Sequence, residues 1–166
     1  ARLPWLIIGM LGGIGNSMIL GNFDATFAAH PEMALYIPLI GGTGGNVGTQ
    51  SSALIVQGLA NSSLDSKNTL KQVAKEAVVA LINATIISLL VYTYNFIRFG
   101  AMATVTYSVS ISLFAVVMFA SIFGTLVPMT LERLKIDPAI ATGPFIAITN
   151  DIIGMMLYMG ITVLLS

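Results

Sequence analysis

Five long apolar stretches, separated by short polar segments, constrain this chain more than any other feature of its sequence. A helix that crosses a membrane needs about 20 predominantly apolar residues. The five predicted spans run from about Pro4 to Gly21, Ala34 to Ala60, Ala77 to Phe96, Met102 to Leu131 and Pro138 to Leu165. The sequence therefore predicts an all-α fold with five transmembrane helices. Neighbouring helices are expected to be antiparallel because their connections are short.

The composition agrees with this prediction. Of the 166 residues, 56% are hydrophobic and 8% are charged, and the mean hydropathy is +0.91. A soluble domain carries about 25% charged residues, so this chain lacks the side chains to cover a surface in water. We therefore predict a multi-pass integral membrane protein with the lipid bilayer as its solvent. The seven basic and seven acidic residues cancel, which argues against a nucleic-acid partner.

The positive charges predict how the helices are oriented in the membrane. If the spans alternate in direction, six of the seven basic residues fall on one side and only Arg98 falls on the other. The six are Arg2, Lys67, Lys71, Lys75, Arg133 and Lys135. Cytoplasmic loops are enriched in Lys and Arg, which places the N-terminus inside and the C-terminus outside. Residues 1–166 are expected to form one transmembrane pore domain, with no cytosolic regulatory domain.

Asp151 lies in the middle of the predicted fifth span, and none of the five spans contains a Lys or Arg to neutralise it. A charge there costs roughly 2.5–3.5 kcal/mol on insertion scales. Two interpretations stay open. The carboxyl is protonated and hydrogen-bonded to a neighbouring helix, or it is ionised in a water-filled cavity where a transported cation is its counter-ion. Its neighbours Ala147 and Gly154 leave room for such an ion, and Pro144 is expected to free a carbonyl oxygen.

A glycine-rich segment, "PLIGGTGGNVGTQSS", interrupts the second apolar stretch. Asn46, Gln50 and Gln57 share one helical face, and amides that faced lipid would be costly. We therefore expect this face to meet protein or water, and we assign Asn46 and Gln50 to the lining of a pore, together with Gly45 and with Gly154 of the fifth span. Glycines at this spacing also serve ordinary helix packing, and that alternative stays open.

Acidic residues mark the predicted inner side of the membrane. Asp137, directly before a proline, is expected to cap the start of the fifth span. Alternatively, Asp137 forms an acidic inner mouth with Glu132 and Glu76. Asn16 and Asn83 are single polar residues within spans, and they are expected to make hydrogen bonds between helices.

Three motifs, in this order and at these spacings, resemble the MgtE-type magnesium transporters, a family related to solute carrier family 41. They are the opening "RLPWL", then "PLIGGTGGNVGTQSSALIVQGLA", and finally "FGTLVPMTLERLKIDPAIATGPFIAITNDIIGMMLY". The Gly-Gly-Asn-x-Gly-x-Gln core and the fourteen-residue step from Asp137 to Asp151 are the most specific parts. The resemblance covers nearly the whole chain.

The resemblance implies a homodimer in a bacterial or archaeal plasma membrane, with a pore along the dimer axis. It also implies that Asp151 and the backbone carbonyl of Ala147 bind Mg2+ in that pore, and that Asp137 lies toward the inner mouth. Such transporters usually carry a cytosolic Mg2+-sensing region, which these residues do not include. No enzymatic activity is expected.

Passive influx of Mg2+ is therefore the predicted function. Mn2+ and Ca2+ stay candidate ions because all three prefer carboxylate, carbonyl and water ligands. The alternative is a proton- or sodium-coupled secondary transporter of divalent cations, in which Asp151 carries the coupling proton.

Overall fold

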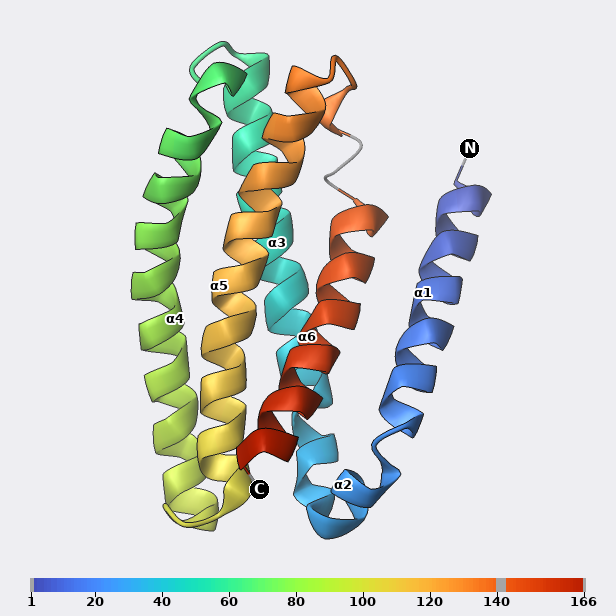
Figure 1. Ribbon diagram of the computed structural model, residues 1–166, viewed down its shortest axis with the longest axis vertical. Helices are drawn as coiled ribbons and strands as arrows, with labels where there is room; N and C mark the ends of the chain where they lie inside the picture. The colour runs from blue at the N-terminus through green and yellow to red at the C-terminus, as the bar shows by residue number, and fades with distance from the viewer. Residues whose placement is uncertain (1, 140–142, 166) are drawn as a thin grey trace.

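The computed structural model describes residues 2–139 and 143–165, and within them all regular secondary structure is helical. The long helices run side by side along one axis (Figure 1). They are α1 (Leu3–Gly21), α3 (Ile37–Ala60), α4 (Thr69–Phe99), α5 (Thr104–Arg133) and α6 (Pro144–Leu165). Short helices lie in the connections: α2 (Asp24–Ala29), η1 (Pro31–Tyr36) and η2 (Ser66–Asn68). The predicted all-α class is confirmed.

Four of the described helices, α1, α4, α5 and α6, are long and apolar enough to cross a membrane. Helix α3 has 24 residues but is not among them, because its glycines and amides lower its hydropathy. The count of five spans therefore stays a prediction. The glycine-rich segment does not break the backbone, since α3 is one continuous helix.

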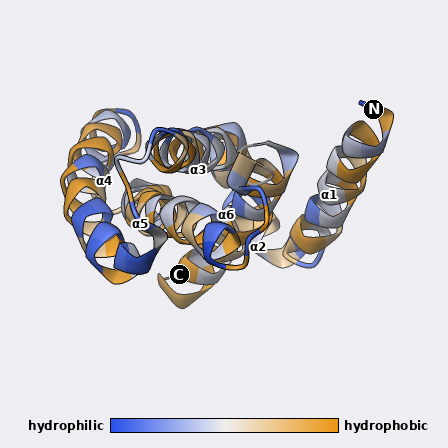
Figure 2. Ribbon diagram, turned by 90° about the horizontal axis from the view of Figure 1, so that it is seen from above, coloured by the Kyte–Doolittle hydropathy of each residue, from blue (hydrophilic) through white to orange (hydrophobic). Residues whose placement is uncertain are grey.

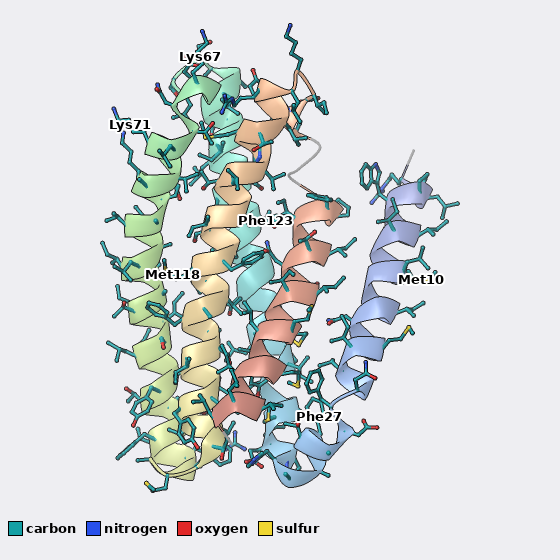
Figure 3. The ribbon with its side chains drawn as sticks, viewed as in Figure 1. Met10, Phe27, Lys67, Lys71, Met118 and Phe123 are labelled. Atoms are coloured by element: carbon teal, nitrogen blue, oxygen red, sulfur yellow. The ribbon has the colours of Figure 1, made fainter. Side chains whose placement is uncertain are left out.

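The basic residues gather at one end of the bundle. Helices α1 and α4 begin at that end, and α5 ends there (Figure 1). Lys67 and Lys71 extend from the same end (Figure 3), whereas Arg98 lies in the last turn of α4, at the opposite end. The structure thus reproduces the six-to-one division of positive charge. Which end faces the cytoplasm stays a prediction.

The start of the fifth span was predicted wrongly. Helix α6 begins at Pro144 rather than Pro138, so Pro144 is at the first helical position, where its missing N–H breaks no bond. It therefore frees no carbonyl inside the helix. Asp137 therefore does not cap α6, and its Oδ1 accepts a hydrogen bond of 3.0 Å from the Ala139 N–H. As a result, Asp151 is the eighth of the 22 residues in α6 and not at its middle.

Helix α5 is the centre of the bundle and packs against α3, α4 and α6. Its hydroxyl side chains are buried without loss of hydrogen bonds where they bond to their own helix. Ser110 donates to the Thr106 carbonyl at 3.0 Å, and Thr125 donates to the Ser121 carbonyl at 2.9 Å. Seen from above, α1 stands apart from α3, α4 and α5 (Figure 2), and none of its described residues is fully buried.

Glycines bring α3 close to α5 and α6. A Cβ atom added to Gly124 of α5 would lie 2.7 Å from the carbonyl oxygen of Gly48, and one added to Gly44 would lie 2.8 Å from Val116 Cγ1. A Cβ atom on Gly48 would overlap the amide of Asn150 on α6. For Gly44 and Gly48, therefore, close helix packing within the protomer accounts for the glycine.

Buried tyrosines attach the segment between α1 and α3 to the rest of the bundle. The Tyr36 hydroxyl donates to Asn95 Oδ1 on α4, and both residues are buried. The Tyr158 hydroxyl on α6 donates to the Met33 carbonyl at 2.9 Å. These bonds connect η1 to two different long helices.

Tyr36→Phe is expected to lower the free energy of unfolding by about 1–3 kcal/mol, since it leaves buried Asn95 Oδ1 without a donor. The measurement is the apparent midpoint of thermal unfolding in detergent. Tyr92→Phe is the matched control because Tyr92 is 36% exposed, and it should leave the midpoint unchanged. Equal midpoints for the two variants would contradict the assigned role of Tyr36.

Candidate metal-binding site

Asp151 projects from α6 toward two glycines of α3. Its Oδ1 lies 3.5 Å from the position that a Cβ atom on Gly41 would take, and 3.8 Å from the corresponding position on Gly45. Gly41 and Gly45 are four residues apart and therefore share one helical face. Because neither carries a side chain, the Asp151 carboxylate lies close to the backbone of α3 at these two positions.

A small cavity lies on the other side of Asp151, between α6 and α1. Its volume is about 70 Å³, and it is lined by Gly9, Gly12, Gly13, Asn16, Ile148 and Asp151. A buried water needs roughly 10–15 Å³ of such volume, so the cavity has room for several. The carboxylate therefore faces a space that water or a hydrated ion can occupy.

No fixed positive charge balances Asp151 within the described part of the chain. The helices around it, α1, α3 and α6, contain no Lys or Arg over their assigned ranges. Among the described residues, His30 Nδ1 lies 3.9 Å from Glu32 Oε1, outside the long helices.

Ala147 lies one helical turn before Asp151 and is half-buried. Helical carbonyls point toward the C-terminus, whereas helical side chains tilt toward the N-terminus. The Ala147 carbonyl and the Asp151 carboxylate therefore approach each other on one face of α6. A carbonyl oxygen has a second lone pair, so its helical hydrogen bond does not prevent it from binding a cation or a water. The described residues contain no group of three or more His, Asp or Glu side chains that could hold a metal ion.

The three acidic residues of the predicted inner mouth divide between two cavities. Glu132 and Asp137 line one of about 280 Å³ at the end of α5. Glu76 lines another, of about 310 Å³, with Gln50 and Asn83. Glu76 thus lies with the amides of α3 and α4, in a different cavity from Glu132 and Asp137, and an inner mouth of the three carboxylates stays a prediction.

Two of the predicted pore-lining residues differ in environment. Asn46 is exposed on the outer side of α3, as expected for a face that meets water or a second protein. Gly154 is buried, and a Cβ atom there would lie 3.8 Å from Ile40 and Val116. In this protomer Gly154 serves the packing of α6 and does not line an open space.

Two asparagines carry buried polar atoms that lack a hydrogen-bond partner among the described residues. Both side-chain polar atoms of Asn150, which is 1% exposed, lack a hydrogen-bond partner among the described residues. The same is true of Asn16 Oδ1, so the hydrogen bond between helices that we expected for this oxygen is not formed. The one available signal for Asn150 was its spacing of four from Ile146 and Gly154, which placed it on the buried face of α6.

Long apolar helices packed around a carboxylate without a basic partner define a multi-pass membrane protein. The sequence profile of MgtE, described as a divalent cation transporter, matches residues 37–161. This chain belongs to the MgtE family.

Bacterial relatives match over almost the whole chain. Magnesium transporter MgtE of Thermus thermophilus is 34% identical over 165 residues, which are 99% of this chain and 36% of the relative. Magnesium transporter MgtE of Bacillus subtilis is 32% identical over 160 residues, which are 96% of this chain and 35% of the relative. The protein of the same name from Enterococcus faecalis is 28% identical over 166 residues. The chain thus spans about a third of the length of these relatives.

Proposed function

We propose that this chain is the membrane-embedded pore domain of a Mg2+ transporter and that Asp151 is its cation-binding carboxylate. The observation that carries the proposal is the position of Asp151. It faces a cavity that can hold water, beside two glycines and without a basic partner in the surrounding helices. An intramembrane carboxylate in such a place is expected to bind a cation. The relatives, named as magnesium transporters, support Mg2+ as that cation.

The outer face of α3 supports a homodimer. Asn46, Gln50, Ala53 and Gln57 are all exposed in the protomer. The amides of Asn46 and Gln57 cannot be satisfied by lipid, whereas Gln50 also borders the cavity that holds Glu76 and Asn83. A second copy of the chain that covered this face would enclose the amides and place a pore at the twofold axis. Two Asp151 side chains near that axis would carry two negative charges. One divalent cation neutralises them, whereas a monovalent cation leaves a charge where charge is costly.

Ala53→Cys is expected to form an intermolecular disulfide in membranes treated with a mild oxidant. The chain has no native cysteine, so any dimer band comes from the introduced residue. Leu90→Cys is the control, because Leu90 is an apolar residue of α4 that is 66% exposed. Cross-linking of Leu90→Cys but not of Ala53→Cys would place the dimer interface elsewhere.

The proposed transport is passive. The membrane potential drives a divalent cation inward with roughly 4.6 kcal/mol per 100 mV, twice the value for a single charge, so no second substrate is needed. Mg2+ keeps several of its waters when it binds, and the space around Asp151 is suited to a partly hydrated ion.

The test is uptake of Mg2+ by proteoliposomes that contain the purified chain, with Mn2+ and Ca2+ as competitors. Saturable uptake that follows an imposed potential at equal pH on both sides is the expected result. Uptake that requires a proton or Na+ gradient would overturn passive transport, and uptake equal to that of protein-free liposomes would overturn the function.

A further inference from the structure

We infer that Asn16 of α1 supplies a second side-chain oxygen to the cation at Asp151, either directly or through an ion-bound water. This inference rests on the proposed function. Asn16 and Asp151 line the same cavity of about 70 Å³. Asn16 Oδ1 is buried in the protomer and has no hydrogen-bond partner among the described residues.

The unpartnered oxygen indicates a ligand. A buried acceptor without a donor costs about 1–3 kcal/mol, and the cost is incurred within a helix that is otherwise almost entirely apolar or glycine. A water or a cation in the cavity would remove this cost, because the amide oxygen would then have a partner. The carboxylate across the cavity makes a cation the favoured occupant.

The packing of α1 holds Asn16 in this position. A Cβ atom on Gly12 would lie 2.5 Å from Ile148 Cγ2 on α6, so the glycine is needed for the two helices to lie this close. Asn16 follows Gly12 by four residues, and Asp151 follows Ile148 by three, which keeps each pair on one helical face. Since α1 and α6 run in the same direction (Figure 1), the close contact at Gly12 brings Asn16 to the level of Asp151.

Asp151 and Asn16 would contribute to cation binding in different ways. Carboxylate and amide oxygens are both hard ligands that suit Mg2+, but only the carboxylate carries charge. Asp151 would therefore provide the attraction that any cation needs. Asn16, which leaves the net charge unchanged, would increase affinity by orienting the ion or its waters.

The experiment measures Mg2+ uptake by proteoliposomes as a function of Mg2+ concentration. Asn16→Leu is expected to raise the half-saturating concentration about tenfold, which corresponds to about 1.4 kcal/mol. Asn16→Asp keeps an oxygen in the cavity and should retain at least the wild-type affinity. Ser17→Leu is the control on the same helix, because Ser17 is exposed and does not line the cavity. It should behave as wild type.

The outcomes separate this inference from the proposed function. If Asn16→Leu takes up Mg2+ with the half-saturating concentration of the wild type, the role of Asn16 is overturned. The role is also overturned if Ser17→Leu raises the half-saturating concentration as much as Asn16→Leu does. Neither result affects the proposed function. Absence of saturable uptake by the wild-type protein would overturn the proposed function and the role of Asn16 with it. If Asn16→Leu fails to fold, Asn16→Ala removes the same oxygen without adding bulk and is judged by the same criterion.

Discussion

Replacing Asp151 with asparagine is expected to reduce Mg2+ uptake into proteoliposomes to the level of protein-free liposomes. The substitution keeps the shape of the side chain but removes its negative charge. No basic or acidic side chain within the assigned ranges of α1, α3 or α6 can replace that charge, since Asp151 is the one ionisable Asp, Glu, Lys or Arg that these helices contain. In the proposed dimer the site loses two charges at once. Mg2+ uptake is therefore expected to fall by well over tenfold, which corresponds to more than about 1.4 kcal/mol.

The control is Asp24→Asn, which removes an exposed carboxylate of α2 that does not line the cavity of Asp151. It should transport as wild type does. Both variants are also compared by gel filtration and thermal unfolding, because the prediction requires that Asp151→Asn stays folded with the wild-type oligomeric state. Wild-type uptake by a folded Asp151→Asn protein would refute the role of this carboxylate.

Gly124→Ala is expected to destabilise the protein by about 1–3 kcal/mol, the usual cost of overpacking. The added methyl group would lie 2.7 Å from the Gly48 carbonyl oxygen and 3.1 Å from Ser51 Cβ. The Gly48 oxygen belongs to the backbone of α3, so it cannot move aside as the end of a flexible side chain can. Helices α3 and α5 must therefore separate, and the contacts on either side of Gly124 are weakened as well.

The measurement is the apparent midpoint of thermal unfolding in detergent, where roughly 2–4 °C is expected per kcal/mol for a chain of this size. Gly160→Ala is the matched control, since a Cβ atom at Gly160 of α6 meets nothing within 4 Å. It should keep or slightly raise the midpoint because alanine favours the helix more than glycine does. A Gly124→Ala midpoint equal to that of Gly160→Ala would show that α3 and α5 are not held as closely as described.

Part of the site could be predicted from the sequence. Asp151 was found because it interrupts an apolar stretch, and its lack of a basic partner was predicted because no Lys or Arg falls within the five predicted spans. The exposure of Asn46 and Gln50 followed from their common helical face. The close position of Gly45 to Asp151 was not predicted as a contact, because it depends on how far α3 and α6 are rotated toward each other.

The sequence by itself determined that this chain is a helical membrane protein with an isolated carboxylate, because hydropathy and charge are properties of single residues and short stretches. The tertiary structure alone decided what surrounds that carboxylate. It placed Asn16 in the cavity of Asp151, buried Gly154 against Ile40 and Val116, and separated Glu76 from Glu132 and Asp137. These neighbours depend on helix rotation, on crossing geometry and on the true start of α6, which are set by contacts between residues far apart in the chain.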